Sequence, residues 1–138
     1  MGNGQQTYNV LPPVEGGKES KLARIKKYAW VEDFPAGITV CDSAGIILEL
    51  NKKAAESLRA EGGMKLIGTN LMGCHPGPAR RKLERLMRKR QTNVYTVTKG
   101  RTRKIILQTP WYQRGRYRGF AEVSLPFSGK IPNHIRKP

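Results

Sequence analysis

Residues 34–50 read FPAGITVCDSAGIILEL and contain two short β-type runs that meet at a turn. The runs are 37–42 and 45–50, and both are rich in β-branched and aliphatic residues. Asp42 opens the turn and Gly45 closes it, and these residue types are favoured at the outer positions of a type I turn. The stretch therefore predicts a β-hairpin.

Helical patterns lie on both sides of this hairpin. Upstream, residues 20–34 carry apolar side chains at helical spacing, with Ser20 as the N-cap and Phe34-Pro35 as the stop. Downstream, Asn51 is placed to cap a short helix over 52–59. Residues 64–76 are broken by glycines and predict short helical turns. A longer helix begins at Pro78, with an apolar stripe formed by Ala79, Leu83, Leu86 and Met87.

Three β-type runs complete the chain, at 93–98, 103–112 and 117–126, and glycine-containing turns join them. This arrangement predicts an antiparallel meander and an α+β fold. Alternation places two sets of side chains on common faces. They are Ile105, Leu107, Thr109 and Trp111 in the second run, and Tyr117, Gly119, Ala121, Val123 and Leu125 in the third.

The order helix, two strands, short helices, one longer helix and three strands resembles a PAS domain. The local sequences that carry the resemblance are FPAGI at 34–38, DSAGII at 42–47, NKKAA at 51–55, LIG at 66–68 and GFAEV at 119–123. The resemblance implies a PAS-like five-stranded antiparallel sheet with a helical flank and an N-terminal helix. We expect an extended or disordered segment at 1–19, a helix at 20–34, the PAS domain at 35–127 and a basic tail at 128–138.

A PAS domain is a sensory or signalling module rather than an enzyme, so the resemblance implies binding of a small ligand or a protein partner. Its pocket would lie between the sheet and the helices, with ordinary core packing as the alternative for each residue. The candidate pocket residues are Cys41, Met72, Cys74, His75, Met87, Tyr95, Leu107, Thr109, Trp111 and Val123. The N-terminal helix would support a homodimer through Leu22, Ile25 and Ala29. A separate output protein is a further expected partner.

The segment Cys74-His75-Pro76 is the sharpest local motif. It resembles a Cys-His-Pro segment of one bacterial PAS subgroup, although Gly77 stands where that subgroup has a second proline. A thiol beside a base and before a helix could act as a nucleophile, so a thiol-dependent enzyme using Cys74 is one alternative. Haem bound through His75 is a second alternative, although haem-binding relatives carry their ligand within the long helix.

The formal net charge of +16 in 138 residues is extreme. Charge of this size attracts polyanions such as nucleic acid, an acidic protein or an anionic lipid surface, although a solvated basic surface explains it equally well. The sequence has no nucleic-acid-binding signature, so it supports non-specific affinity only. The candidate polyanion-binding residues are Arg80, Arg81, Lys82, Arg85, Arg88, Lys89 and Arg90, with Arg114, Arg116 and Arg118 expected on one strand face.

Cysteine and histidine content indicates the compartment and the metal chemistry. Two cysteines without a signal peptide fit a reduced, cytoplasmic chain, and two histidines give no familiar zinc spacing. No stretch approaches the length of a transmembrane helix, so we expect no membrane span.

Overall fold

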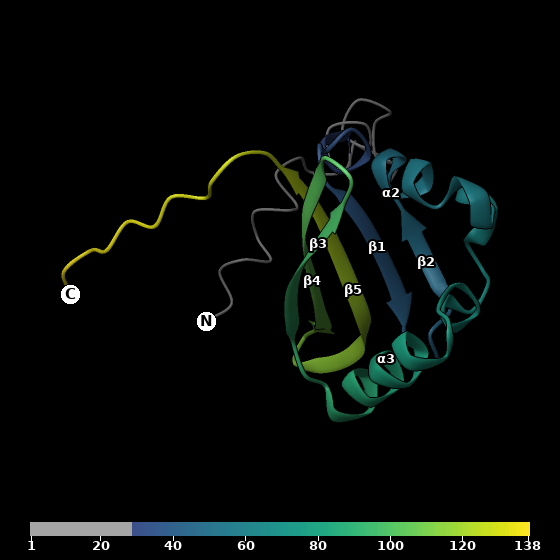
Figure 1. Cartoon of the computed structure of the whole chain (residues 1–138). Coiled ribbons are helices and arrows are strands. Elements are labelled where there is room, and N and C mark those ends of the chain that lie inside the picture. Colours follow the sequence, from purple (N-terminus) through teal and green to yellow (C-terminus); the bar gives the residue numbers. More distant parts are fainter. Residues whose placement is uncertain (1–28) are drawn as a thin grey trace, which may run out of the picture.

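The computed structural model describes residues 29–138. They form one five-stranded antiparallel sheet in the order β2-β1-β5-β4-β3, with the helices gathered on one side of it (Figure 1). This is the α+β arrangement that the sequence predicts. The strands are β1 (Gly37–Asp42), β2 (Ile47–Leu50), β3 (Asn93–Lys99), β4 (Thr102–Gln113) and β5 (Arg116–Phe127). The helices are α2 (Lys52–Ser57) and α3 (Gly77–Lys89), with 3-10 turns η2 (Arg59–Glu61), η3 (Gly63–Leu66) and η4 (Leu71–Cys74).

The first hairpin turns where its sequence predicts. The Gly45 N–H donates to the Asp42 carbonyl at 3.0 Å, and the Asp42 carboxylate accepts from the Ala44 and Ile46 N–H groups at 2.9 Å each. Gly45 has φ +87°, a conformation that favours glycine. The second strand begins at Ile47, later than predicted, because Ile46 forms only an isolated bridge to Asn70.

The core lies between the sheet and the helices as two clusters of buried side chains. One joins Cys41 and Phe120 of the sheet to Leu83, Leu86 and Met87 of α3. The other joins β2 to the shorter helices and contains Ile47, Leu50, Ala54 and Leu66. The predicted stripe of α3 is wrong at Ala79, which is exposed because it lies in the first helical turn.

Asn51 connects residues 31–36 to the sheet and is only 2% exposed. Its Oδ1 accepts from the N–H groups of Ile38 and Ala54 at 2.9 and 3.0 Å. Its Nδ2 donates to the carbonyls of Val31 and Ala36 at 3.0 and 2.8 Å. The residue therefore caps α2 and also ties the segment before β1 to the first strand.

A bulge interrupts the ladder between β4 and β5. Trp111 pairs with Gly119 and Tyr112 with Tyr117, so Arg118 has no partner on β4. Tyr117 consequently turns toward the core cluster of Cys41 and α3, and the prediction that it shares a face with Gly119 is wrong. The prediction of one arginine face also fails here, because Arg114 lies in the turn with φ +50° and Arg118 lies in the bulge.

The expected dimer residues Leu22 and Ile25, the segment 1–19 and most of the helix 20–34 lie outside the described residues. Residues 29–32 are helical, and Ala29 is exposed. None of the helices in residues 29–138 is both long and apolar enough to cross a membrane.

Candidate ligand site on the inner face of the sheet

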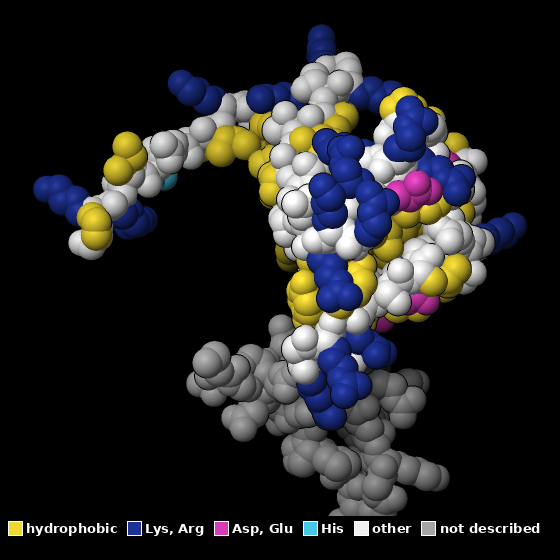
Figure 2. Space-filling view, turned by 90° about the horizontal axis from the view of Figure 1, so that it is seen from below, with side chains coloured by type: hydrophobic (Ala, Val, Ile, Leu, Met, Phe, Trp, Pro, Cys, Tyr) yellow, Lys and Arg dark blue, Asp and Glu magenta, His cyan; other side chains and the backbone are white. Residues whose placement is uncertain are grey.

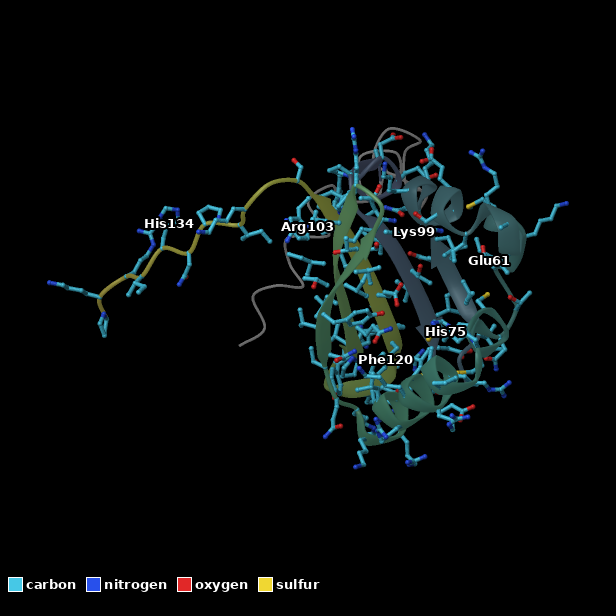
Figure 3. The ribbon with its side chains drawn as sticks, viewed as in Figure 1. Glu61, His75, Lys99, Arg103, Phe120 and His134 are labelled. Carbon is cyan, nitrogen blue, oxygen red and sulfur yellow. The ribbon has the colours of Figure 1, made fainter. Side chains whose placement is uncertain are left out.

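The inner face of the sheet, toward α3, carries polar side chains at the centre of three neighbouring strands. Side chains alternate along a strand, and the register aligns Thr39 with Glu122 and Glu122 with Gln108. Cys41 and Phe120 are neighbours on this face and pack against α3 (Figure 3). The polar positions therefore lie beside the apolar core rather than at the rim.

A continuous row of hydrogen bonds links these polar groups. Asn93 Nδ2 donates to Gln108 Oε1 at 3.0 Å, and Gln108 Nε2 donates to Glu122 Oε2 at 2.9 Å. Gln108 is 6% exposed, so its amide needs both partners to offset the loss of water. We call Asn93, Gln108 and Glu122 the polar row. Glu122 is its terminal acceptor, and Oε1 of this carboxylate has no hydrogen-bond partner among residues 29–138.

A small cavity of about 20 Å³ lies against the polar row, between the sheet and the helices. This volume is enough for one water molecule. Its walls combine hydrogen-bonding and apolar groups, which is the composition of small-molecule sites. They are Thr39, Cys41, Gln108, Glu122, Phe120 and Ala121 from the sheet and Leu71 and Leu83 from the helices.

Tyr95 and Lys82 lie at the β3 side of this region. Tyr95 is on the inner face, next to Ile106 in register, and Lys82 Nζ lies 5.6 Å from the centroid of its ring. Burial and the negative charge of Glu122 raise the pKa of the Tyr95 hydroxyl. The phenol therefore remains a hydrogen-bond donor at neutral pH.

The two thiols have environments that disfavour the reactive thiolate. Burial, and to a lesser extent Asp42, raises the pKa of Cys41 although the backbone N–H of Phe120 lowers it. Burial and then the charge of Glu61 raise the pKa of Cys74. His75 Nδ1 lies 2.9 Å from the Leu71 carbonyl oxygen, so that ring nitrogen is engaged by backbone. This geometry does not supply the activated thiol that nucleophilic catalysis needs.

The predicted pocket residues fall into three places. Cys41, Met72 and Met87 meet in one core cluster, and Tyr95 lies on the same inner face. Cys74 packs against the other cluster, and His75 is the C-cap of η4 (Figure 3). The remaining four predicted residues lie on the opposite, outer face, and they are Leu107, Thr109, Trp111 and Val123. Val123 is in register with Ile38 of β1 and Leu107 of β4, and Thr109 and Trp111 follow Leu107 at two-residue spacing.

The sequence pattern predicts these four residues for the pocket because alternation identifies which side chains share a face but not which face the helices cover. Trp111 lies over Gly119, and its indole N–H donates to the Cys41 carbonyl at 2.9 Å. A Cβ on Gly119 would collide with that same oxygen, so the two strands approach as closely as a glycine allows.

Sequence reasoning missed the polar row. The available signal was the position of Gln108 and Glu122, each a polar residue in the middle of a long β-type run. A polar side chain at such a position that also falls on the buried face needs a partner on a neighbouring strand. The register that supplies the partner is visible only in the folded sheet.

A haem group does not fit the residues present. The cavity beside α3 has about the volume of one water molecule and is lined by Leu71, Leu83 and Phe120, with no histidine among its walls. His75 does not line this cavity, and its Nδ1 is held by backbone. Within residues 29–138 no three His, Cys, Asp or Glu side chains gather as metal ligands would.

The predicted polyanion-binding residues lie on the exposed side of α3, the side turned away from the sheet. Figure 2 shows this side of the molecule, where Lys and Arg side chains greatly outnumber acidic ones. Arg80 Nε is paired with Glu84 Oε1 at 2.9 Å. The guanidinium of Arg90 lies 4.5 Å from the centroid of the Tyr117 ring, which joins the end of α3 to the start of β5.

Solved structures with this architecture come from several organisms. A C-terminal domain from Streptococcus mutans is similar with a TM-score of 0.61 at 16% identity, over 83% of this chain and 90% of that one. The PAS domain of an HTR-like protein from Haloarcula marismortui gives 0.53 at 14% identity, over 78% and 93%. A sensory box sensor histidine kinase from Vibrio cholerae gives 0.54 at 11%, over 79% and 94%. No protein-family model and no curated protein matches the sequence.

Proposed function

Because the chain has a PAS fold, we propose that it is a non-catalytic sensory or signalling module that binds a small ligand beneath α3. The polar row beside the cavity is the observation that carries the proposal. The Gln108 amide is buried and the Glu122 carboxylate is half-buried, and taking such groups out of water costs stability that an apolar sheet would avoid. Their placement is that of orienting groups in a ligand site.

The chemistry of the polar row indicates the kind of ligand. Asn93 donates to Gln108 and Gln108 donates to Glu122, so the row of hydrogen bonds ends at the carboxylate of Glu122. A ligand that reaches Glu122 therefore presents an N–H or ammonium donor and places its apolar part against Cys41, Phe120 and Leu83. The cavity holds only one water, so such a ligand displaces Leu71 or shifts α3 as it enters.

A route from this site to the N-terminal segment passes through β1. Thr39 and Cys41 line the cavity, and the N–H of Ile38, between Gly37 and Thr39 on the same strand, donates to Asn51. Asn51 in turn holds the carbonyls of Val31 and Ala36. Ligand occupancy that displaces β1 would in this way reorient the helix that precedes it and signal to a separate output protein.

The outer face of the sheet supports the homodimer in this proposal. It carries Ile38, Val40, Val94, Ile105, Leu107, Val123 and Leu125, of which Val94 is 61% and Leu125 44% exposed. Apolar side chains gathered on an exposed face favour association with a second copy. Both described cysteines are free thiols, which agrees with the reducing cytoplasm as the proposed location.

The ligand proposal is tested by thermal-shift screening of the purified chain with two matched sets of small aromatic compounds. One set carries a primary amine and the other carries a carboxylate at the same position. We expect amines to raise the melting temperature and carboxylates to leave it unchanged. Glu122→Gln should abolish the shift, whereas Glu49→Gln, which removes an exposed charge from β2, should retain it. Native mass spectrometry reports ligand stoichiometry and the number of subunits together. Stabilisation that survives Glu122→Gln, or that only carboxylates cause, would overturn the proposal.

A further inference from the structure

Within residues 29–138, the excess of positive charge lies in the second part of the chain. Residues 29–76, which form β1, β2, α2 and the 3-10 turns, carry four Lys and Arg against six Asp and Glu, a net charge of −2. Residues 77–138, which form α3, the meander and the tail, carry 17 against two, a net charge of +15. A basic surface kept only for solubility would not need this segregation.

Within the positive part, α3 presents one continuous cationic side. Six of its 13 residues are Lys or Arg, and Arg90 follows as its C-cap. The sole acidic residue of α3, Glu84, is paired with Arg80. Arg114 and Arg116 extend the charge across the β4–β5 turn, beside Tyr117 and Arg90. We call Arg81, Arg85, Arg88, Lys89, Arg90, Arg114 and Arg116 the basic face, which Figure 2 views directly.

A groove runs beside the basic face, where the end of α3 meets the turn after β1. Its volume is about 370 Å³, with Met72 and Met87 among its walls and Arg88, Arg90, Ser43 and Tyr117 supplying hydrogen-bonding groups. Glu84 also lines it, with its carboxylate held by Arg80. This volume falls in the range of sites for small molecules and their fragments.

Aromatic rings accompany the arginines at this groove. The Arg90 guanidinium stacks over Tyr117, and the Tyr112 ring meets that of Tyr117 edge-on with centroids 6.1 Å apart. Tyr112 is 52% exposed, so one side of its ring is open to a ligand. Cationic side chains interleaved with exposed aromatic rings are the combination that holds unpaired bases and their phosphates.

We propose that the basic face and its groove bind single-stranded nucleic acid, a site separate from the cavity on the inner face. Arg81, Arg85, Arg88 and Lys89 contact phosphates, while a base stacks on Tyr112 or enters the groove. A duplex keeps its bases stacked and could use only the phosphate contacts. An anionic bilayer fits less well because α3 exposes no large apolar side chain for insertion.

The test measures binding of a labelled oligothymidylate of roughly 20 nucleotides and of a duplex of the same length, by fluorescence anisotropy between about 50 and 200 mM NaCl. We expect the single strand to bind at least about tenfold more tightly than the duplex, because stacking adds to the phosphate contacts. The triple variant Arg85→Gln, Arg88→Gln, Lys89→Gln should weaken binding at least about tenfold. It should also lower the slope of log K against log salt by about two, since each single-strand phosphate contact contributes roughly 0.7.

A matched control removes three exposed charges elsewhere in the positive half. Lys99→Gln, Arg101→Gln, Lys130→Gln acts at the β3–β4 turn and the tail, at the opposite end of the sheet (Figure 3). It should retain most of the affinity. Tyr112→Ala should weaken single-strand binding without changing the salt slope. Equal losses in both triple variants, duplex binding as tight as single-strand binding, or equal affinity for polyglutamate or phosphatidylserine vesicles would each overturn the proposal.

Discussion

At the centre of the sheet, the face that the helices cover carries polar side chains and the uncovered face carries apolar ones. An antiparallel sheet with one covered face ordinarily places apolar side chains toward the helices and polar ones toward water. Here the inner face carries the polar row of Asn93, Gln108 and Glu122, while the outer face carries half-exposed aliphatic residues such as Val123 and Leu125. Neither arrangement is what stability alone favours, and this contrast is the basis of the two binding functions that we propose, a ligand inside and a second copy of the chain outside.

Both faces of the sheet require the close contact between the central strand, β5, and its neighbour β1. Gly119→Ala should destabilise the fold by at least about 3 kcal/mol, because the added Cβ would collide with the Cys41 carbonyl and the Asp42 backbone. Urea denaturation followed by circular dichroism measures the change. Gly73→Ala is the control, since nothing lies within 4 Å of its added Cβ, and should change stability by no more than about 0.5 kcal/mol. Equal stability of the two variants would contradict a close approach of β1 and β5 at Gly119.

Making the inner face as apolar as the outer one tests the polar row. Gln108→Leu should cost about 1–3 kcal/mol because it leaves Asn93 and Glu122 without their shared partner. The double variant Gln108→Leu, Glu122→Leu should recover part of that loss, since the orphaned carboxylate is gone. A double-mutant cycle from urea denaturation measures the coupling. Simple additivity of the two costs would show that the row does not act as a unit.

Adding a charge to the outer face tests the proposed homodimer. Leu125→Lys should shift the chain toward monomer in light scattering while changing the stability of the monomer by no more than about 0.5 kcal/mol, because Leu125 is already 44% exposed. Met64→Lys places the same charge at a position that is 50% exposed on η3, and it should leave the oligomeric state unchanged. A monomeric wild-type chain at high concentration would contradict the proposed dimer.

The smallest expected effect is a pH dependence of the stability, caused by the thiol of Cys41, which lies where the inner face meets α3. Burial raises the pKa of this thiol in the folded state, so the unfolded chain releases the proton at a lower pH than the folded one. The resulting stability is fully present below the ordinary thiol pKa and is lost as pH rises through the raised folded value. The drop in urea midpoint between neutral pH and about pH 10 should be smaller in Cys41→Ala than in the wild type. An identical drop in both proteins would contradict this.

Much of the fold could be predicted from local patterns. The turn at Asp42 and Gly45, the cap at Asn51 and the helix start at Pro78 use side chains that act within a few residues of themselves. Predictions failed where distant strands decide the outcome. The bulge at Arg118 turns the side chain of Tyr117 to the inner face of the sheet. The helices cover the face opposite to the one that carries Leu107, Thr109, Trp111 and Val123, so these four residues lie away from the proposed cavity.

The sequence by itself determined the element order, the antiparallel meander and the unequal distribution of charge, because each depends on residue type and on spacing along the chain. The tertiary structure alone decided which polar residues meet. Asn93 and Gln108 are separated by 15 residues and Gln108 and Glu122 by 14, and only the register of three strands brings their side chains into hydrogen-bonding distance. A one-residue slip in either strand pair would turn one partner to the other face, so the polar row exists only as a property of the assembled sheet.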